Sequence, residues 1–201
     1  MTAALDLEAV SRRFGTRLAL APLNLRLSRG SVCTVEGANG AGKTTLLRIA
    51  AGLLAPSTGT RAADGMALYA RSGSGARAVD RVDGSVARLL HLAGLPRSEV
   101  RRRADDVLCR LALQPLAERR VDELSAGERG RLSLALVAAV RPAIACLDEP
   151  TASLDVEGRR LAAEVVGDLA AVGCAVLVAT HDPDLLPDAD GRLVLTAGLV
   201  A

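Results

Sequence analysis

Alternation of apolar and polar residues marks the start of the chain. Residues 5–10 and 18–27 alternate in this way, which is typical of strands with one buried face. The tripeptide Phe-Gly-Thr at 14–16 stands between them and predicts a turn. Residues 32–36 are a third apolar run, which leads into a glycine-rich segment. We therefore expect three strands before the first helix.

Helical spacing of apolar residues appears in several later segments. Ser98 and Ser125 each stand where such a segment begins, and serine is a preferred N-cap. Between the first of these segments and the second, residues 57–85 are the least regular part of the chain, with one short apolar piece at 66–70. The predicted helices cover residues 43–54, 86–95, 98–113, 126–140 and 156–171.

Uninterrupted apolar runs at 143–147 and 174–179 alternate with predicted helices. Strands of this kind are typical of a parallel sheet that is covered on both faces, so the fold class is α/β. Short strands are expected at 192–195 and 198–200. The helix-only stretch 86–140 lies between two strand regions and indicates a helical insert.

Composition excludes several classes of protein. Half of the residues are hydrophobic and 24% are charged, an ordinary globular mixture with a net charge of +2. This charge gives no general argument for binding nucleic acid, and one Phe, one Tyr and no Trp are too few for a base-stacking surface. No apolar run approaches the length of a membrane span, and the N-terminus lacks the apolar core of a signal peptide.

Lysine usage singles out one position. Of the 25 lysine and arginine residues, only Lys43 is a lysine. In a composition that favours arginine so strongly, a lone lysine indicates a role that a planar guanidinium does not fill. Chance survival is the alternative, and the neighbours of Lys43 argue against it.

A glycine-rich segment joins the third predicted strand to the first predicted helix. It fits the phosphate-loop pattern G-x-x-x-x-G-K-[ST], in which glycines let the backbone turn its N–H groups toward phosphate oxygens. The start of the following helix adds the positive end of its dipole. The lysine is a compact cation for the β- and γ-phosphates, and the threonine hydroxyl ligates Mg²⁺. The segment comprises Gly37, Ala38, Asn39, Gly40, Ala41, Gly42, Lys43 and Thr44.

Two carboxylates directly follow the apolar run at 143–147. Asp148 is a candidate to hold Mg²⁺, because hard cations prefer oxygen ligands. Glu149 is a candidate to orient or deprotonate the attacking water. Taken alone, Asp-Glu after an apolar strand would more often start a helix. The phosphate loop in the same chain is the reason for assigning this pair to a nucleotide site.

Two further positions extend this site. Ser125 and Gly127 open a predicted helix, and a helix N-terminus with a serine and a glycine is a second candidate anion site as well as an ordinary cap. His181 follows the apolar run at 174–179, where it can approach a γ-phosphate. A structural role is the alternative for this histidine.

These motifs, in this order, resemble those of the ATP-binding subunits of ABC transporters over nearly the whole chain. GANGAGKTT, which ends at Thr45, is similar to the Walker A loop, and AIACLDEP to the Walker B strand with its catalytic glutamate at Glu149. LSAGE is similar to the signature motif, ASLD with Asp155 to the D-loop, and THD with His181 to the switch histidine. Phe14 stands where the family places an aromatic residue against adenine; a core or turn role is its alternative.

The resemblance implies a fold and a domain plan. The fold would be a P-loop NTPase of the ABC ATPase type, a mixed sheet core flanked by helices with a helical subdomain inserted. Residues 1–201 would form a single ATP-binding domain. Its core would comprise residues 1–83 and 141–201, and residues 84–140 would be the helical subdomain that carries the signature motif.

The resemblance also implies partners. Two copies, expected to be identical, would pair head to tail around two ATP molecules with Mg²⁺. ATP binding would close the pair and hydrolysis would reopen it, which drives transmembrane permease subunits. The chain would then be cytoplasmic and peripheral on the inner face of the cell membrane. The residues that one copy would supply to each ATP are Lys43, Thr44, Thr45, Asp148, Glu149 and His181, of which Thr44 and Asp148 would bind the metal. The other copy would supply Ser125 and Gly127. Asp155 would lie at the interface between the two copies.

Two departures from the family pattern bear on coupling. The family has a glutamine at a strand end between Walker A and the helical part, where it touches Mg²⁺ and the transport partner, whereas the only glutamine here is Gln114. Ser72 or Ser74 are the candidates to substitute for it. The signature also reads LSAGE, with Ala126 in place of a glycine and a glutamate in place of glutamine.

The small size and the LSAG sequence are similar to those of the ATPase subunit of the bacterial haem exporter used in cytochrome c maturation. Other compact ABC importers and exporters share this pattern. Two alternatives of other classes are a soluble ABC-type ATPase that acts outside transport and an ATP-binding regulator with impaired hydrolysis. The missing glutamine motivates the regulator, and the complete set of catalytic candidates argues against it.

Overall fold

The structure is a computed structural model that describes residues 3–182, 185–186, 188–196 and 199–200 of the chain. It separates into two compact units. Unit 1 comprises residues 1–69, 142–149 and 166–201, and unit 2 comprises residues 70–141 and 150–165.

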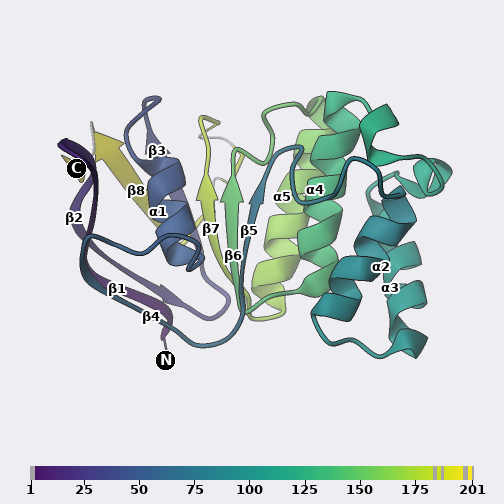
Figure 1. Ribbon diagram of the computed structural model, residues 1–201, viewed down its shortest axis with the longest axis horizontal. Coiled ribbons are helices and arrows are strands. Elements are labelled where there is room, and N and C mark those ends of the chain that lie inside the picture. The colour runs from purple at the N-terminus through teal and green to yellow at the C-terminus, as the bar shows by residue number, and fades with distance from the viewer. Residues whose placement is uncertain (1–2, 183–184, 187, 197–198, 201) are drawn as a thin grey trace. The chain divides into compact units, whose positions relative to one another are not determined.

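Strands and helices alternate along much of the chain (Figure 1). The strands are β1 (Ala3–Phe14), β2 (Arg17–Ser28), β3 (Val32–Gly37), β4 (Thr58–Ala63), β5 (Ala67–Arg71), β6 (Ile144–Asp148), β7 (Ala175–Ala179), β8 (Gly191–Thr196) and β9 (Leu199–Val200). The helices are α1 (Lys43–Ala50), α2 (Val82–Leu92), α3 (Arg97–Arg110), α4 (Ala126–Val140) and α5 (Val156–Ala171), with 3₁₀ turns η1 (Gln114–Leu116) and η2 (Val121–Glu123).

Two sheets carry the strands. One is antiparallel with the order β2-β1-β4, and the other has the order β5-β6-β7-β3-β8-β9. In the larger sheet β3 pairs in parallel with both β7 and β8, and β6 pairs in parallel with β7, whereas β8 and β9 are antiparallel. The predicted α/β class with a mixed sheet is therefore confirmed.

Strand register decides where the candidate residues meet. Asp148 pairs with Ala179 on the β6–β7 ladder, and Ala179 pairs with Val35 on the β7–β3 ladder. The carboxyl ends of β3, β6 and β7 therefore lie at one edge of the sheet, and Figure 1 shows the arrowheads of β6 and β7 side by side there. Residues that follow these three strands come together there although they are far apart in the sequence.

Helix α1 is shorter than the predicted helix 43–54. It ends at Ala50, and Gly52 takes a positive φ of 75° just beyond it. Gly52 N donates to Ile49 O and Leu53 N donates to Arg48 O, both at 2.9 Å, which is the Schellman pattern of a helix end. The glycine that the sequence offered as a stop signal thus ends the helix two residues before its own position.

Strand β4 is missing from the prediction, which treated its residues as irregular. Its sequence TGTRAA has no apolar alternation, and five of its six residues are exposed. The strand is held by its antiparallel ladder with β1 and by a 2.7 Å hydrogen bond between the hydroxyls of Ser11 and Thr58. Edge strands of this kind carry little hydrophobic signal, because neither face is buried.

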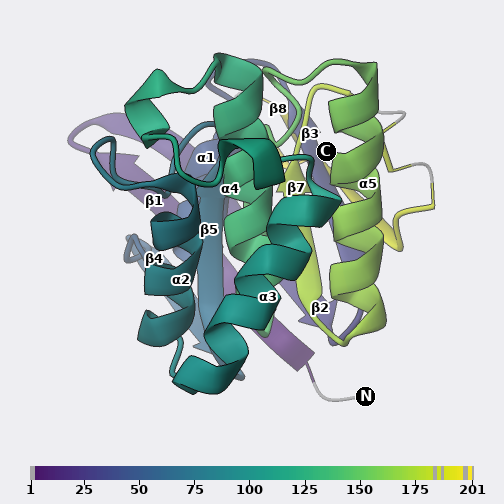
Figure 2. The same cartoon turned by 90° about the vertical axis from the view of Figure 1, so that its right-hand side faces the viewer.

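Helices α2, α3 and α4 contact one another in unit 2, and Figure 2 shows α2 beside α3. Helix α2 begins at Val82, four residues before the predicted start, and the amides of Val82 and Asp83 donate to the carbonyls of Arg119 and Ala117. A distant segment therefore satisfies donors that a helix N-terminus normally leaves unpaired.

The two predicted serine caps have different outcomes. Ser98 is not a cap: α3 begins at Arg97 after Pro96, whose φ of −66° already suits entry into a helix. Ser125 is the N-cap of α4, and its hydroxyl accepts from Glu128 N at 3.2 Å while the Glu128 carboxylate accepts from Ser125 N at 2.6 Å. This capping box holds the pKa of Glu128 below its ordinary value, because the ionised carboxylate accepts the Ser125 hydrogen bond.

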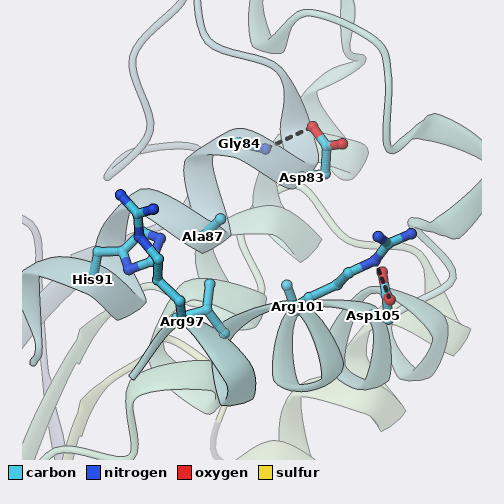
Figure 3. Close-up of a pocket in the computed structure, with 9 residues that line it drawn as sticks. Asp83, Gly84, Ala87, His91, Arg97, Arg101 and Asp105 are labelled. Carbon is cyan, nitrogen blue, oxygen red and sulfur yellow. Dashed lines mark hydrogen bonds and ion pairs between the residues drawn. The ribbon is translucent and has the colours of Figure 1, made fainter. Parts of the chain in front are cut away.

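A pocket lies between α2 and α3 in unit 2 (Figure 3). His91, Arg97 and Arg101 line it together with two carboxylates. Both carboxylates are paired with arginines, Asp83 with Arg81 at 3.3 Å and Asp105 with Arg101 at 4.0 Å. The pocket contains none of the residues that the sequence analysis assigned to nucleotide or metal.

Candidate nucleotide site at the carboxyl ends of three strands

The glycine-rich loop joins β3 to α1 and adopts conformations that other residues rarely take. Gly37 has φ 143°, and a Cβ there would lie 2.3 Å from the carbonyl oxygen of Leu195 and 3.1 Å from Ala41 Cβ. Gly42 has φ 107° and is the N-cap of α1, which has neither a side-chain cap nor an acidic residue in its first turn. The amides and the positive dipole end of this helix therefore favour an anion.

Lys43 is the first residue of α1 and is buried, with 7% of its surface exposed. Its ammonium donates to Gly37 O at 2.7 Å and lies 3.0 Å from His181 Nε2. The Glu149 carboxylate oxygen Oε1 is 3.8 Å away. The only lysine of the chain thus sits inside the glycine loop, beside two of the other candidate residues.

Asp148 ends β6, and only 2% of its surface is exposed. The Thr44 hydroxyl donates to its Oδ2 atom at 2.8 Å. A hydroxyl and a carboxylate side by side form an all-oxygen donor set, which suits Mg²⁺. Within the residues described, there is no cluster of three or more His, Cys, Asp or Glu, the kind of cluster that holds a resident transition metal.

Glu149 follows Asp148 in a strained backbone conformation, with φ 50°. Its amide donates to Ala179 O at 2.9 Å, and its Oε2 atom accepts from His181 N at 3.3 Å. The Oε1 atom is buried and has no hydrogen-bond partner, although His181 Nε2 lies 3.2 Å from it. A buried carboxylate oxygen of this kind retains its capacity to accept a hydrogen bond or a proton.

His181 places one ring nitrogen among three groups. Nε2 lies 3.0 Å from the Lys43 ammonium and 3.1 Å from Asn39 Oδ1, in addition to Glu149. Lysine can only donate, so Nε2 accepts from it when the other ring nitrogen carries the proton. The two oxygens can only accept, so Nε2 serves either of them when it is itself protonated. The ring tautomer of His181 therefore selects its partners.

The remaining candidates lie in other surroundings. Phe14 is 48% exposed at the end of β1, and the Arg12 guanidinium lies 4.6 Å from the centre of its ring. A Cβ on Gly127 would lie 3.1 Å from Ser153 O, and Asp155 accepts a hydrogen bond from Gly158 N at 2.8 Å. Ser125, Gly127 and Asp155 belong to unit 2, whereas the cluster around Lys43 belongs to unit 1.

The only glutamine and the two serines proposed to substitute for the missing one lie in different surroundings. Gln114 lies in η1, within unit 2. The Ser74 hydroxyl donates to Arg71 O at 2.7 Å, a hydrogen bond within its own turn, while the Ser72 hydroxyl is buried without a hydrogen-bond partner.

Sequence reasoning missed Tyr69, whose hydroxyl donates to Asp148 Oδ2 at 2.7 Å. Its rarity was the available signal, since it is the only tyrosine of the chain.

Comparison with known proteins gives clear matches. Residues 20–152 match the family model described as ABC transporter. The biotin transport ATP-binding protein BioM of Rhizobium etli is 33% identical over 209 residues, which cover 98% of this chain and 92% of that protein. The iron(III) import ATP-binding protein FbpC of Vibrio cholerae is 33% identical over 189 residues, 88% of this chain but only 54% of that protein. The chain thus spans about half the length of the latter relative.

Solved structures agree with the sequence matches. The structure of cbiO1 from Clostridium perfringens, described as part of the ABC transporter complex cbiONQ, aligns with a TM-score of 0.82 at 27% identity. The alignment covers all of this chain and 88% of that one. The chain belongs to the ABC transporter family and has the fold of its ATP-binding domain.

Proposed function

We propose that this chain binds and hydrolyses ATP as the ATP-binding subunit of an ABC transporter and couples hydrolysis to separate membrane subunits. One observation carries the proposal: Lys43, Glu149 and His181 converge within 4 Å of one another beside the glycine loop. The Thr44–Asp148 pair adds an oxygen donor set to the same strand edge. Family membership supports the same activity.

The loop 37–42 and Lys43 are proposed to bind the phosphates. The positive-φ glycines shape a backbone whose amides suit phosphate oxygens, and the unneutralised start of α1 adds a favourable dipole. The Lys43 ammonium exchanges carbonyl partners for phosphate oxygens, and charge-assisted hydrogen bonds are the stronger kind. Ala38, Asn39, Ala41 and Thr45 complete this set as the neighbours in the loop and the helix.

Thr44 and Asp148 are the residues that would hold Mg²⁺, because they bring a hydroxyl and a buried carboxylate together at 2.8 Å. When bound, the ion would neutralise charge on the β- and γ-phosphates. Asp148 ends a strand that is buried along its whole length, so its backbone position is fixed.

Glu149 is proposed as the general base. Its buried Oε1 atom has no hydrogen-bond partner, so it can accept a hydrogen bond from a water molecule and then the proton of that water. His181 lies 3.2 Å from the same oxygen and is proposed to orient the γ-phosphate or the water through Nε2.

Phe14, which is half exposed, is proposed to stack on adenine.

A second copy of the chain is proposed to complete the site. Ser125 and Gly127 open α4 in unit 2, where Ser125 caps the helix and a Cβ on Gly127 would lie 3.1 Å from Ser153 O. They would face the ATP of the partner copy, and Asp155 would lie at the seam. This arrangement makes hydrolysis depend on pairing of two ATP-binding units.

Transport requires a membrane partner. In the part of the chain that the structure describes, none of the helices combines the length and apolar character needed to cross a bilayer. We propose that permease subunits bind the chain at the inner face of the cell membrane. The relatives are named for iron(III) import and biotin transport, and these names give no support to haem export, which rests on size and the LSAG sequence alone.

Affinity purification from detergent-solubilised membranes of the native host tests this function. We expect a polytopic membrane protein to co-purify, and ATP turnover by the co-purified complex to exceed that of the isolated chain. A parallel purification of Lys43→Ala should retain the membrane protein but lose the turnover. Recovery of the chain with ribosomal or DNA-repair proteins alone would support the non-transport ATPase instead. Equal background turnover in wild type and Lys43→Ala complexes would support the inactive regulator.

A further inference from the structure

Tyr69 makes a contact that the proposed chemistry does not use. Its hydroxyl donates to Oδ2 of Asp148 at 2.7 Å, and the Thr44 hydroxyl donates to the same oxygen at 2.8 Å. One atom of a buried carboxylate therefore holds two hydroxyl donors, which come from β5 and from α1. Two donors on one oxygen fill the acceptor capacity of that atom and fix the carboxylate plane.

The Tyr69 ring is itself held in place. It packs against the hydrophobic core of unit 1, and the Arg48 guanidinium lies 5.8 Å from the ring centre. The phenol hydroxyl is the donor of the hydrogen bond to Asp148, and the carboxylate oxygen is its acceptor. Contact with the core and with Arg48 thus restricts the position of this partly buried side chain.

We propose that Tyr69 is a positioning residue of the metal site: its hydroxyl fixes the Asp148 carboxylate in the orientation that receives Mg²⁺ with the nucleotide. The inference rests on the proposed nucleotide site. Without the Tyr69 hydroxyl, the Thr44 hydroxyl is the one hydroxyl donor that remains on Asp148 Oδ2. The carboxylate would then be less ordered in the free protein and would have to become ordered when the ion binds. Preorganisation of this kind strengthens binding because the ordering cost is met in the free protein.

Tyr69→Phe tests this role, because it keeps the ring and removes only the hydroxyl. The probe is Mn²⁺, whose free concentration is followed by electron paramagnetic resonance at a saturating concentration of a non-hydrolysable ATP analogue. We expect Tyr69→Phe to bind Mn²⁺ about five- to tenfold more weakly than wild type, within the range for loss of one typical protein hydrogen bond. Affinity for the analogue in excess EDTA should stay within about twofold. Thr60→Val, which removes an exposed hydroxyl on β4, is the matched control and should change neither value.

Each outcome of this titration decides between the claims. Unchanged Mn²⁺ affinity in Tyr69→Phe would overturn the positioning role while leaving the nucleotide site intact. Equal loss of analogue binding with and without metal would also overturn it, since the hydroxyl would then only support the fold. Absence of analogue binding by wild type would instead remove the proposed function itself, which keeps the two failures distinct.

Tyrosine emission gives a second readout without activity. The chain has one tyrosine and no tryptophan, so emission from wild type reports on Tyr69 alone. We expect emission to change when Mg²⁺ joins the bound analogue, because the acceptor of the phenol hydrogen bond then also faces a dication. Asp148→Asn should abolish this change at the same analogue saturation. A wild-type emission that is the same with and without Mg²⁺ would contradict the coupling between Tyr69 and the metal site.

Discussion

Glu149→Gln is expected to bind ATP with Mg²⁺ at near wild-type affinity and to hydrolyse it about a thousandfold more slowly, within the range that removal of a general base produces. The amide keeps the size of the side chain and its contact with His181 N, but it does not accept a proton from water. Oε1 of Glu149 is buried without a hydrogen-bond partner, although His181 Nε2 lies 3.2 Å and the Lys43 ammonium 3.8 Å from it. The substitution does not alter Lys43, whose ammonium lies in the glycine loop 2.7 Å from Gly37 O in the wild-type chain, so phosphate binding should survive.

Single-turnover hydrolysis and equilibrium binding of ATP, measured on the same preparation, separate these two effects. Glu164→Gln is the matched control: Glu164 is exposed on α5 and pairs with Arg160, and the same substitution there should leave turnover unchanged. Hydrolysis by Glu149→Gln at more than about a tenth of the wild-type rate would exclude Glu149 as the base.

Gly37→Ala is expected to lower the free energy of unfolding by about 2–4 kcal/mol and to weaken ATP binding at least about tenfold. The added Cβ would lie 2.3 Å from the Leu195 carbonyl oxygen. Leu195 pairs with Gly37 on the β3–β8 ladder, so backbone must move on one side or the other. The φ of 143° adds strain that an alanine does not relieve, and both effects displace the loop that precedes Lys43.

Gly167→Ala provides the control for Gly37→Ala. Gly167 lies inside α5, and a Cβ there would meet no atom within 4 Å. Alanine is the better helix former, so this variant should be as stable as wild type or more stable by about 0.5–1 kcal/mol. Denaturant unfolding of the three proteins checks the order of stability. Wild-type stability and ATP affinity in Gly37→Ala would show that the close approach to Leu195 does not constrain the loop.

Hydrophobic pattern predicted the part of the fold that is buried. Strands β6 and β7 are buried at every residue, and their apolar runs are unambiguous in the sequence. The exposed strand β4 and the early start of α2 were missed for a shared reason. Each is held by hydrogen bonds to a distant segment, which local pattern does not encode.

The candidate site followed from motif order because parallel strands align their ends. Asp148, Ala179 and Val35 are paired side by side across the sheet, near the carboxyl ends of β6, β7 and β3. The residues that follow these three strands therefore lie close together. Tyr69 did not follow from the sequence, since its hydroxyl reaches Asp148 from a strand that has no motif of its own. The side-chain geometry of Glu149, with one unpartnered oxygen, likewise depends on packing that only the structure supplies.

Calorimetric titration of wild type, Lys43→Ala and Arg26→Ala with ATP and Mg²⁺ tests the central claim most directly. Arg26 is an exposed cation of unit 1, paired with Asp6 at 3.6 Å, and controls for loss of one positive charge. We predict saturable binding to wild type and to Arg26→Ala, and affinity at least about a hundredfold weaker for Lys43→Ala, as expected for the loss of a buried charge-assisted contact. Equal affinity of all three proteins, or no binding to wild type, would contradict the assignment of the nucleotide site.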